Sequence, residues 1–318
     1  MKKNLCFLIL SVLLMMGSVL PVEAAVFNVT KTEDTNDGAC DADCSLREAV
    51  LACNAAADDT NEIHIPAGTY VLIIGGRGEE IGETGDLDLN ISSNGTPLAG
   101  KTIILQGAGN KLTIIDANHI DRAIGIHGGN AEIAGVTIRN GQADEFVGFD
   151  GIGGAIESVA TGRVVLRQSN FEKNRAHDAA GGILIFGADR VEITECNFLD
   201  NRAEGNPNTF GGGLSIWDVR EAVIGQSLFF KNWASNVGGG IDVFDQGGVG
   251  FDGGTTHILN STISGNFAAL GGGGLSNWTS HVNISFSTLQ GNEVEAGPFA
   301  SGANLWSNIF PIELKGTI

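Results

Sequence analysis

The sequence predicts an all-β fold, a right-handed parallel β-helix with an N-terminal capping helix. Glycine accounts for 47 of the 318 residues, which is twice its ordinary share of about 7%. A glycine inside a helix costs about 1 kcal/mol relative to alanine, so a mostly helical protein is excluded. Short apolar segments broken by glycine also recur at intervals of 26 to 34 residues. Such a period, with no helical pattern inside the repeat, is typical of a solenoid whose coils stack on one another.

The first 24 residues have the pattern of a secretory signal peptide. Lys2 and Lys3 precede an uncharged apolar run over residues 5–20, and the small-residue pattern that follows predicts cleavage after Ala24. The run is short for a membrane span, and no later segment approaches the required length. We therefore expect an exported chain without a transmembrane span, located outside the cell, on its surface or at the outer membrane.

The negative charge of the chain excludes polyanionic partners. The formal net charge is -19, although only 17% of the residues are charged. Nucleic acid and anionic membrane surfaces would repel such a chain, so we expect neither as a partner. The 42% of hydrophobic residues are enough to build a core, which excludes a disordered chain.

Residues 25–60 predict a small N-terminal cap made of a strand, a loop and a helix. The strand covers residues 26–29, and an acidic, turn-rich loop over residues 34–43 follows it. Ser45 and Glu48 have the spacing of a capping box, in which each side chain accepts a hydrogen bond from the other residue's main-chain N–H, so a helix is expected to begin there. Its apolar face comprises Leu46, Ala49, Val50 and Cys53. Such a helix would cover the first edge of the strand stack, whose bare N–H and C=O groups would otherwise recruit other chains.

Four cysteines remain after the predicted cleavage: Cys40, Cys44, Cys53 and Cys196. An exported chain meets oxidising conditions, so Cys40 and Cys44 in the acidic loop are expected to form a disulfide. Two alternatives stay open, in which these residues are buried thiols or metal ligands. A zinc site would need a second Cys/His pair at suitable spacing, and none follows.

Residues 37–49, with the sequence DGACDADCSLREA, resemble the CSLREA domain, whose six-letter core is matched without a change. The resemblance implies an N-terminal module of an exported bacterial protein whose body is a right-handed parallel β-helix. The family has no assigned catalytic residues. Cys53 departs from the family, in which a small residue is expected at this position, so Cys44 has a second potential disulfide partner.

Residues 61–318 carry the repeat that predicts the β-helix. One motif has an apolar residue, then Phe or another apolar residue five positions later, then Asn three positions after that. The asparagines are Asn174, Asn201, Asn232, Asn266 and Asn292, at spacings of 27, 31, 34 and 26 residues. Equivalent positions in successive coils stack about 4.8 Å apart, so the Phe and Ile positions predict a dry core along the axis. The asparagines predict a ladder of amide hydrogen bonds from coil to coil.

A Gly-Gly-x-Ile/Leu motif or a variant of it follows each asparagine and predicts a turn in which the backbone needs positive φ. The two motifs together resemble the repeats of polymorphic outer-membrane proteins, and the expected fold is that of pectin lyase-like proteins. Two or three short strands are expected in each coil. Leu314 fits the apolar position eight residues before the asparagine of a next coil, so the β-helix is expected to stop in the middle of a coil. Either the native reading frame continues, or the sequence is that of a truncated gene product.

Three aromatic residues, Trp217, Phe244 and Trp278, lie three positions after the Ile or Leu of the glycine motif in successive coils. As a stacked row they predict a face that could bind glycans. The alternative is that they only pack a bend and extend the core.

Asp218 and Asp245 directly follow two of these aromatic residues on adjacent coils and are the candidate catalytic residues. Retaining glycosidases use carboxylates about 5 Å apart, whereas Asp at a turn is also ordinary turn chemistry. The glycine-rich insertion over residues 245–257 is the best candidate for a functional loop.

A bound cation is a further hypothesis. Asp86 and Asp88 alternate with leucine and could bind a cation, with Ca²⁺ as the candidate. The same alternation is also typical of the solvent face of an edge strand. The 6 histidines are scattered and predict no metal site.

These patterns predict an exported structural, adhesive or glycan-binding module without catalysis, whose partners are glycans or other cell-surface components. Two alternatives remain. Analogy with pectate lyases and polygalacturonases, which share the expected fold, raises a lyase or glycoside hydrolase that acts on an acidic polymer. The expected continuation of the chain raises a passenger fragment of an autotransporter-like protein.

Overall fold

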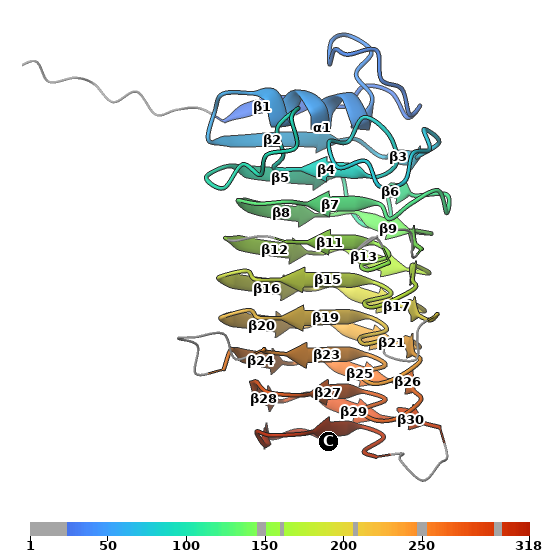
Figure 1. The fold of residues 1–318 in the computed structure, drawn as a ribbon, viewed down its shortest axis with the longest axis vertical. Helices are drawn as coiled ribbons and strands as arrows, with labels where there is room; N and C mark the ends of the chain where they lie inside the picture. Colours follow the sequence, from blue (N-terminus) through green and yellow to red (C-terminus); the bar gives the residue numbers. More distant parts are fainter. Residues whose placement is uncertain (1–23, 145–150, 160–161, 206–208, 247–252, 296–300) are drawn as a thin grey trace, which may run out of the picture.

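The computed structural model describes residues 24–144, 151–159, 162–205, 209–246, 253–295 and 301–318. These residues form a right-handed parallel β-helix, in which each strand pairs with its counterpart in the next coil (Figure 1). The helix α1 (Leu46–Ala55) lies at the N-terminal end of the stack. The prediction of a parallel β-helix with an N-terminal helix is confirmed.

In the described part of the chain, four parallel sheets wrap around the core, and from β10 onward the chain passes through sheets 1, 2, 3 and 4 in turn. Sheet 1 comprises β1 (Ala25–Asn28), β2 (Thr60–Ile65), β5 (Thr102–Gly107), β8 (Asn130–Ala134), β12 (Arg163–Arg167), β16 (Arg190–Thr194), β20 (Glu221–Gly225), β24 (Thr255–Leu259), β28 (His281–Ser285) and β32 (Ile312–Lys315). Sheet 2 comprises β3 (Gly68–Val71), β6 (Thr113–Asp116), β9 (Thr137–Arg139), β13 (Asn170–Glu172), β17 (Asn197–Leu199), β21 (Leu228–Phe230), β25 (Thr262–Ser264) and β29 (Thr288–Gln290). Sheet 3 comprises β10 (Gln142–Ala143), β14 (Arg175–Ala176), β18 (Arg202–Ala203), β22 (Trp233–Ala234), β26 (Phe267–Ala268) and β30 (Glu293–Val294). Sheet 4 comprises β4 (Leu87–Leu89), β7 (Ile124–Ile126), β11 (Ile156–Ser158), β15 (Ile183–Phe186), β19 (Leu214–Trp217), β23 (Ile241–Phe244), β27 (Leu275–Asn277) and β31 (Leu305–Ser307).

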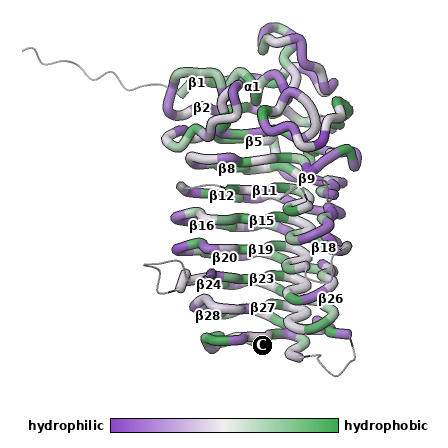
Figure 2. The backbone as a smooth tube through the Cα atoms, viewed as in Figure 1, coloured by the Kyte–Doolittle hydropathy of each residue, from purple (hydrophilic) through white to green (hydrophobic). Residues whose placement is uncertain are grey.

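The core is a dry stack of apolar side chains enclosed by the sheets. Side chains of a strand alternate between the core and the outer face, and Figure 2 shows polar and apolar positions alternating along the coils. In sheet 2 the rings of Phe171, Phe198 and Phe229 stack on one another, with centroid separations of 5.1 and 4.5 Å. Ile263 and Leu289 continue this column in the next two coils. Each coil therefore extends the same apolar column by one side chain.

The number of strands in a coil differs from the sequence prediction of two or three. From β10 onward each coil has a further strand of two residues in sheet 3, and from β14 onward this strand directly follows the ladder asparagine, as β14 follows Asn174. Two residues are too few to show alternation, so this strand leaves no periodic signal in the sequence.

The asparagines of the repeat form a continuous buried ladder. From Asn201 onward, each Oδ1 accepts hydrogen bonds from the main-chain N–H and the side-chain Nδ2 of the asparagine one coil earlier, at 2.9 to 3.1 Å, and Asn174 Oδ1 accepts from the Gly141 N–H. Each Nδ2 also donates to a main-chain carbonyl, as Asn201 does to Phe171 at 2.8 Å. None of the five is more than 6% exposed. The ladder thus satisfies polar groups that would otherwise be buried without partners.

The Gly-Gly motif meets two demands at once. Its first glycine has positive φ, 65° at Gly211 and 70° at Gly238, a conformation that glycine adopts without steric cost. Its second glycine lies against the next coil, so that a Cβ on Gly212 would come within 2.4 Å of the carbonyl oxygen of Gly239. The motif therefore turns the chain and lets neighbouring coils approach closely.

Hydrogen bonds of residues 45–48 hold the N-terminal cap in place. α1 begins with the predicted capping box, in which the Glu48 N–H donates to Ser45 Oγ and the Ser45 N–H donates to Glu48 Oε2. Arg47 is fully buried, and its guanidinium donates to the Asp34 carboxylate at 2.8 Å. It also donates to the main-chain carbonyls of Gly82, Gly85 and Asp86. Arg47 therefore ties α1 to the segment that precedes β4.

Cys40 and Cys44 form a disulfide, as the sequence predicted. Cys53 and Cys196 are buried free thiols. Burial raises the pKa of each of these two thiols to about 12.

Two regions singled out in the sequence lie wholly or partly outside the described residues. Residues 1–23, which are all of the predicted signal peptide except Ala24, lie outside the described residues. So do residues 247–252, which make up much of the insertion at 245–257. Among the residues that the structure does describe, no helix is both long and apolar enough to cross a bilayer.

We predict that the folded chain from Ala25 onward does not react with thiol reagents at mildly alkaline pH, and that unfolding exposes two reactive thiols. The thiolate is the reactive form, and burial keeps Cys53 and Cys196 protonated. A colorimetric thiol titration with and without guanidinium chloride measures this. Mapping of unreduced peptides should recover a crosslink between Cys40 and Cys44, and a crosslink from Cys44 to Cys53 would contradict the pairing.

We predict that Asn201→Ala lowers the free energy of unfolding by about 2–4 kcal/mol, because the Asn174 N–H and the Phe171 carbonyl lose their partners inside the core. Urea unfolding followed by circular dichroism measures the change. Asn308→Ala is the matched control, since this side chain is exposed and should matter by less than about 0.5 kcal/mol. Equal effects of the two substitutions would show that the ladder does not stabilise the stack.

Candidate functional site

Trp217, Phe244 and Trp278 lie side by side on three neighbouring coils at the end of sheet 4. Trp217 and Phe244 are paired in register as the last residues of β19 and β23, and Trp278 directly follows β27. The ring centroids are 6.1 Å apart for Trp217 and Phe244 and 6.3 Å apart for Phe244 and Trp278, both in edge-to-face geometry. All three side chains are half-exposed. The structure therefore brings the predicted aromatic residues together on the surface.

Two more rings extend this group, which we call the aromatic row. Phe210 lies 6.2 Å from Trp217 and 6.0 Å from Trp278 between ring centroids, and Trp306 lies 4.7 Å from Trp278. Neither is apparent from the sequence, because Phe210 precedes the glycine motif and Trp306 follows Leu305 by one position instead of three. The aromatic row comprises Phe210, Trp217, Phe244, Trp278 and Trp306.

The aromatic row has a packed side and an open side. Trp217 packs against a small apolar cluster outside the main core, made of Ile152, Ala179, Ala180 and Leu184. Edge-to-face contacts of this kind stabilise aromatic clusters by about 0.5–1.5 kcal/mol per pair. The rings nevertheless keep part of their surface in solvent, so packing and ligand contact are compatible.

A buried carboxylate, Asp242, lies beneath the aromatic row. It is in β23, two residues before Phe244, and is 0% exposed. It accepts hydrogen bonds from Ser276 Oγ at 2.5 Å and from Trp217 Nε1 at 3.1 Å. The Trp278 indole N–H also lies close enough to lower the pKa of Asp242, although it is not aligned for a hydrogen bond. Burial outweighs these donors and raises the pKa of Asp242 to about 6.

Little in the sequence singles out Asp242. Its register position in sheet 4 is occupied by Ser215 in one neighbouring coil and Ser276 in the other, and such a mixed column does not look like a site. The sequence pattern that could have indicated the site is Asp242 two positions before Phe244, which places both side chains on the same face of the strand. A parallel sheet places that carboxylate next to the aromatic side chain of the adjacent strand.

Asp218 and Asp245 are neighbours in the structure, but both carboxylates accept hydrogen bonds from main-chain N–H groups. Asp218 accepts a hydrogen bond from the Gln246 N–H at 2.5 Å, and Asp245 accepts one from the Gly254 N–H at 2.6 Å. Burial raises the pKa of Asp218, and the charge of Asp245 raises it further. Asp245 is only 5% exposed. The bond of Asp245 joins the two sides of segment 247–252, and the bond of Asp218 ties the start of the segment to the preceding coil. Both favour a structural role for the pair.

Asp86 and Asp88 do not form a solvent face, as one interpretation of the Asp/Leu alternation had it. β4 is an edge strand, yet Asp86 and Asp88 are 4% and 0% exposed. Arg122 lies between Asp86, at 3.1 Å, and Glu157, with which it forms a second buried ion pair. Burial raises the pKa of Asp86 and of Asp88, and the negative charge of Glu80 raises both pKa values further.

A hollow near the cap lies away from the aromatic row. It has a volume of about 930 Å³ and is lined by α1 and the segment from Ile91 to Lys101. The Lys101 ammonium is engaged there, donating to the Ala56 carbonyl at 2.6 Å. The hollow therefore does not bring the candidate residues of the sequence together.

Comparison with known proteins finds no match to this chain among protein-family models, curated proteins or solved structures. The function must therefore be inferred from the geometry of the chain itself.

We predict that the stability of the protein relative to its Asp242→Asn variant falls by about 3 kcal/mol as pH rises from about 3 to about 7. The folded state binds the Asp242 proton more tightly than the unfolded state does, so deprotonation disfavours folding in this window. Urea unfolding of both proteins across the range measures the difference. Tryptophan emission should change with a midpoint near pH 6 only in the unsubstituted protein, and a pH-independent difference in stability would contradict the assignment.

Proposed function

We propose that this chain is an exported, non-catalytic module that binds glycans along the aromatic row. The observation that carries the proposal is the half-exposed line of Trp217, Phe244 and Trp278 across consecutive coils. Aromatic faces stack on the C–H faces of sugar rings, and a few polar groups beside them fix orientation. A row parallel to the solenoid axis would follow a linear polymer for several residues.

The charge of the protein selects among glycans. The net charge is -19, and Asp218 lies half-buried directly after Trp217. An acidic polysaccharide would be repelled by this surface. The proposed ligands are therefore neutral glycans, displayed by other cells or present in the extracellular matrix.

Export and surface display are part of the same proposal. The signal-peptide pattern of residues 1–24 supports export, and the resemblance of residues 37–49 to the CSLREA domain supports an N-terminal module of an exported bacterial β-helix. The role of Arg47 and Glu48 in fastening the cap gives a physical reason for that motif.

One observation favours a second candidate function, a glycoside hydrolase. Asp218 and Asp245 are close enough for one carboxylate to raise the pKa of the other, and paired carboxylates with separated pKa values are what hydrolysis needs. The proposal of a non-catalytic module is preferred because both carboxylates accept main-chain hydrogen bonds.

We predict that Phe244→Ala and Trp278→Ala each weaken binding to a neutral glycan by at least about tenfold, because each removes one stacking surface. A glycan array identifies the ligand, and calorimetry measures the affinities. Phe230→Ala is the matched control, since Phe230 is 38% exposed on sheet 2, outside the aromatic row. Equal losses in Phe230→Ala and Phe244→Ala would contradict a specific binding face.

The same preparations test the hydrolase. Incubation with neutral and acidic polysaccharides should release no new chain ends. Release that Asp218→Asn or Asp245→Asn abolishes would replace the binding function with the enzymatic one.

A further inference from the structure

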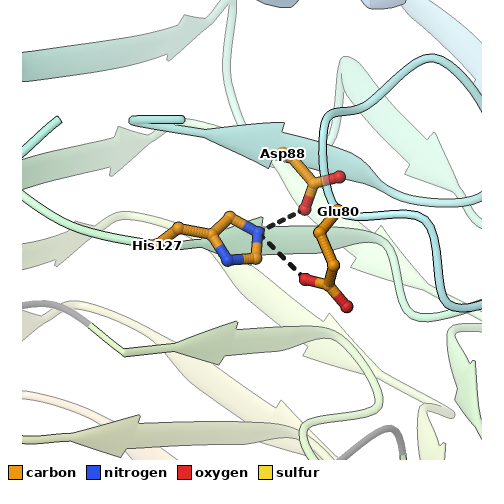
Figure 3. A group of neighbouring side chains, drawn as sticks. All are labelled: Glu80, Asp88 and His127. Carbon is orange, nitrogen blue, oxygen red and sulfur yellow. Dashed lines mark hydrogen bonds and ion pairs between the residues drawn. The ribbon is translucent and has the colours of Figure 1, made fainter. Parts of the chain in front are cut away.

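Three side chains that are distant in the sequence converge at the N-terminal end of sheet 4 (Figure 3). Asp88 comes from β4, His127 directly follows β7, and Glu80 comes from the segment before β4. His127 Nε2 lies 2.5 Å from Asp88 Oδ1 and 3.5 Å from Glu80 Oε2. One donor atom from each residue lies within 4.8 Å of the others. These residues, which we call the Asp–His–Glu cluster, lie apart from the aromatic row, so a role for the cluster is independent of the proposed glycan binding.

Gly125 leaves the space between the donor atoms open. It pairs in register with Asp88 on the adjacent strand. A Cβ at Gly125 would lie 2.3 Å from Asp88 Oδ1, 2.7 Å from His127 Nε2 and 3.4 Å from Asp86 Oδ2. Any other residue at this position would therefore occupy the point on which the carboxylates and the imidazole converge.

The second oxygen of Asp88 is the observation that points to a ligand. The Asp88 side chain is 1% exposed, and its Oδ2 makes no hydrogen bond within the described residues, although the Gly82 N–H lies close enough to the carboxylate to lower its pKa. A buried carboxylate oxygen without a partner is costly, so native proteins normally supply a donor or a cation. Asp88 turns Oδ1 toward His127, and Oδ2 is the oxygen of the same carboxylate on the side away from the imidazole (Figure 3).

We infer that Glu80, Asp88 and His127 bind a divalent transition-metal ion of the zinc type. The donor set is one imidazole nitrogen and two carboxylates, which suits Zn²⁺ and its neighbours, whereas Ca²⁺ takes six to eight oxygen ligands. At metal–ligand distances of about 2.0–2.1 Å, tetrahedral ligand atoms lie about 3.3 Å apart. The separation of 3.5 Å between His127 and Glu80 already fits. The Asp88–His127 contact would open by about 0.8 Å as the ion replaces the hydrogen bond.

The surroundings of the cluster favour a cation despite a nearby arginine. Arg122 is engaged by Asp86 and Glu157, which balance its charge. Glu79 adds negative charge that acts on both Asp88 and His127. The exposed fraction of the side chains also increases outward, from 1% for Asp88 to 16% for His127 and 49% for Glu80. The cluster therefore has a buried base and a solvent-facing rim through which an ion can enter.

The proposed ion would add a link between segments that strand pairing and the Arg122–Asp86 ion pair already join. Glu80 lies just before the carbonyls of Gly82, Gly85 and Asp86 that bind Arg47. Asp88 and His127 belong to adjacent coils of sheet 4. The ion would therefore fasten the segment held by α1 to the body of the solenoid, and three protein ligands would leave one coordination position for water.

The sequence predicts only part of this site. Asp86 and Asp88 stand out as candidate cation ligands, but the scattered histidines predict no metal site, because His127 is 39 residues from Asp88. The proposed site departs from that interpretation because the structure places His127 against Asp88. The pairing of Asp88 with Gly125 needs the register of β4 and β7, which no local pattern reveals.

The test uses the untagged chain from Ala25, stripped of metal with a chelator and then freed of the chelator. Zn²⁺ alone is titrated into it by calorimetry near neutral pH. We expect one Zn²⁺ per chain with a dissociation constant at or below about 10 μM, and a Tm that rises with Zn²⁺ concentration. Ca²⁺ at the same concentrations should leave the Tm unchanged. Co²⁺ should give the visible absorption bands of a four-coordinate site with nitrogen and oxygen ligands.

Matched variants separate the cluster from other histidines and carboxylates of the surface. His127→Gln and Glu80→Gln should each weaken Zn²⁺ binding at least about tenfold. His119→Gln and Glu83→Gln, which change exposed side chains outside the cluster, should not alter it. Glu80 lies at the rim, so its substitution is compatible with folding, which circular dichroism verifies. Absence of Zn²⁺ binding, equal or tighter Ca²⁺ binding, or undiminished Zn²⁺ binding in His127→Gln and Glu80→Gln would each overturn the assignment.

Discussion

The asparagine ladder is the interaction on which the rest of the structure depends. A parallel β-helix turns its backbone sharply at each corner, and these corners would bury polar groups inside the coil. Asn201 accepts hydrogen bonds from Asn174 and donates one to the Phe171 carbonyl. The asparagine of one coil therefore supplies hydrogen-bond partners for the buried polar groups of the coil before it. Because the side chain spans neighbouring coils, it also fixes their register. The columns on the outer surface of the coils that the ladder joins, such as Trp217 beside Phe244, follow from that register.

The regular half of the molecule could be predicted from the sequence because its signals repeat. Phe171, Phe198 and Phe229 recur at the same offset from the ladder, and the residue types alone indicate a buried column. Ser45 and Glu48 predicted the start of α1 for a different reason, since a capping box is local in the chain. The two-residue strands of sheet 3 could not be predicted, because pairing such as that of Ala176 with Ala203 exists only between coils.

The candidate sites also differ in how far a repeated sequence pattern predicts them. The alignment of Trp217 with Phe244 follows from a repeated offset, whereas Asp242 breaks its own column and becomes notable only when Trp217 and Ser276 are seen to enclose it. Glu80 and His127 lie in coils of irregular length, where no repeat predicts which residues meet. Chemistry placed in the irregular coils depends on long-range register, which a single sequence does not display.

The axial direction of the strand hydrogen bonds has a mechanical consequence. A pulling force along the solenoid axis acts on the coils in series, and each coil is held only by its neighbours. The outermost coil would therefore detach first, releasing about 90–120 Å of extended chain for 26 to 34 residues before the next coil bears the load. A force across the axis would instead shear all the sheets together. The same fold is thus compliant when stretched end to end and stiff when pressed from the side.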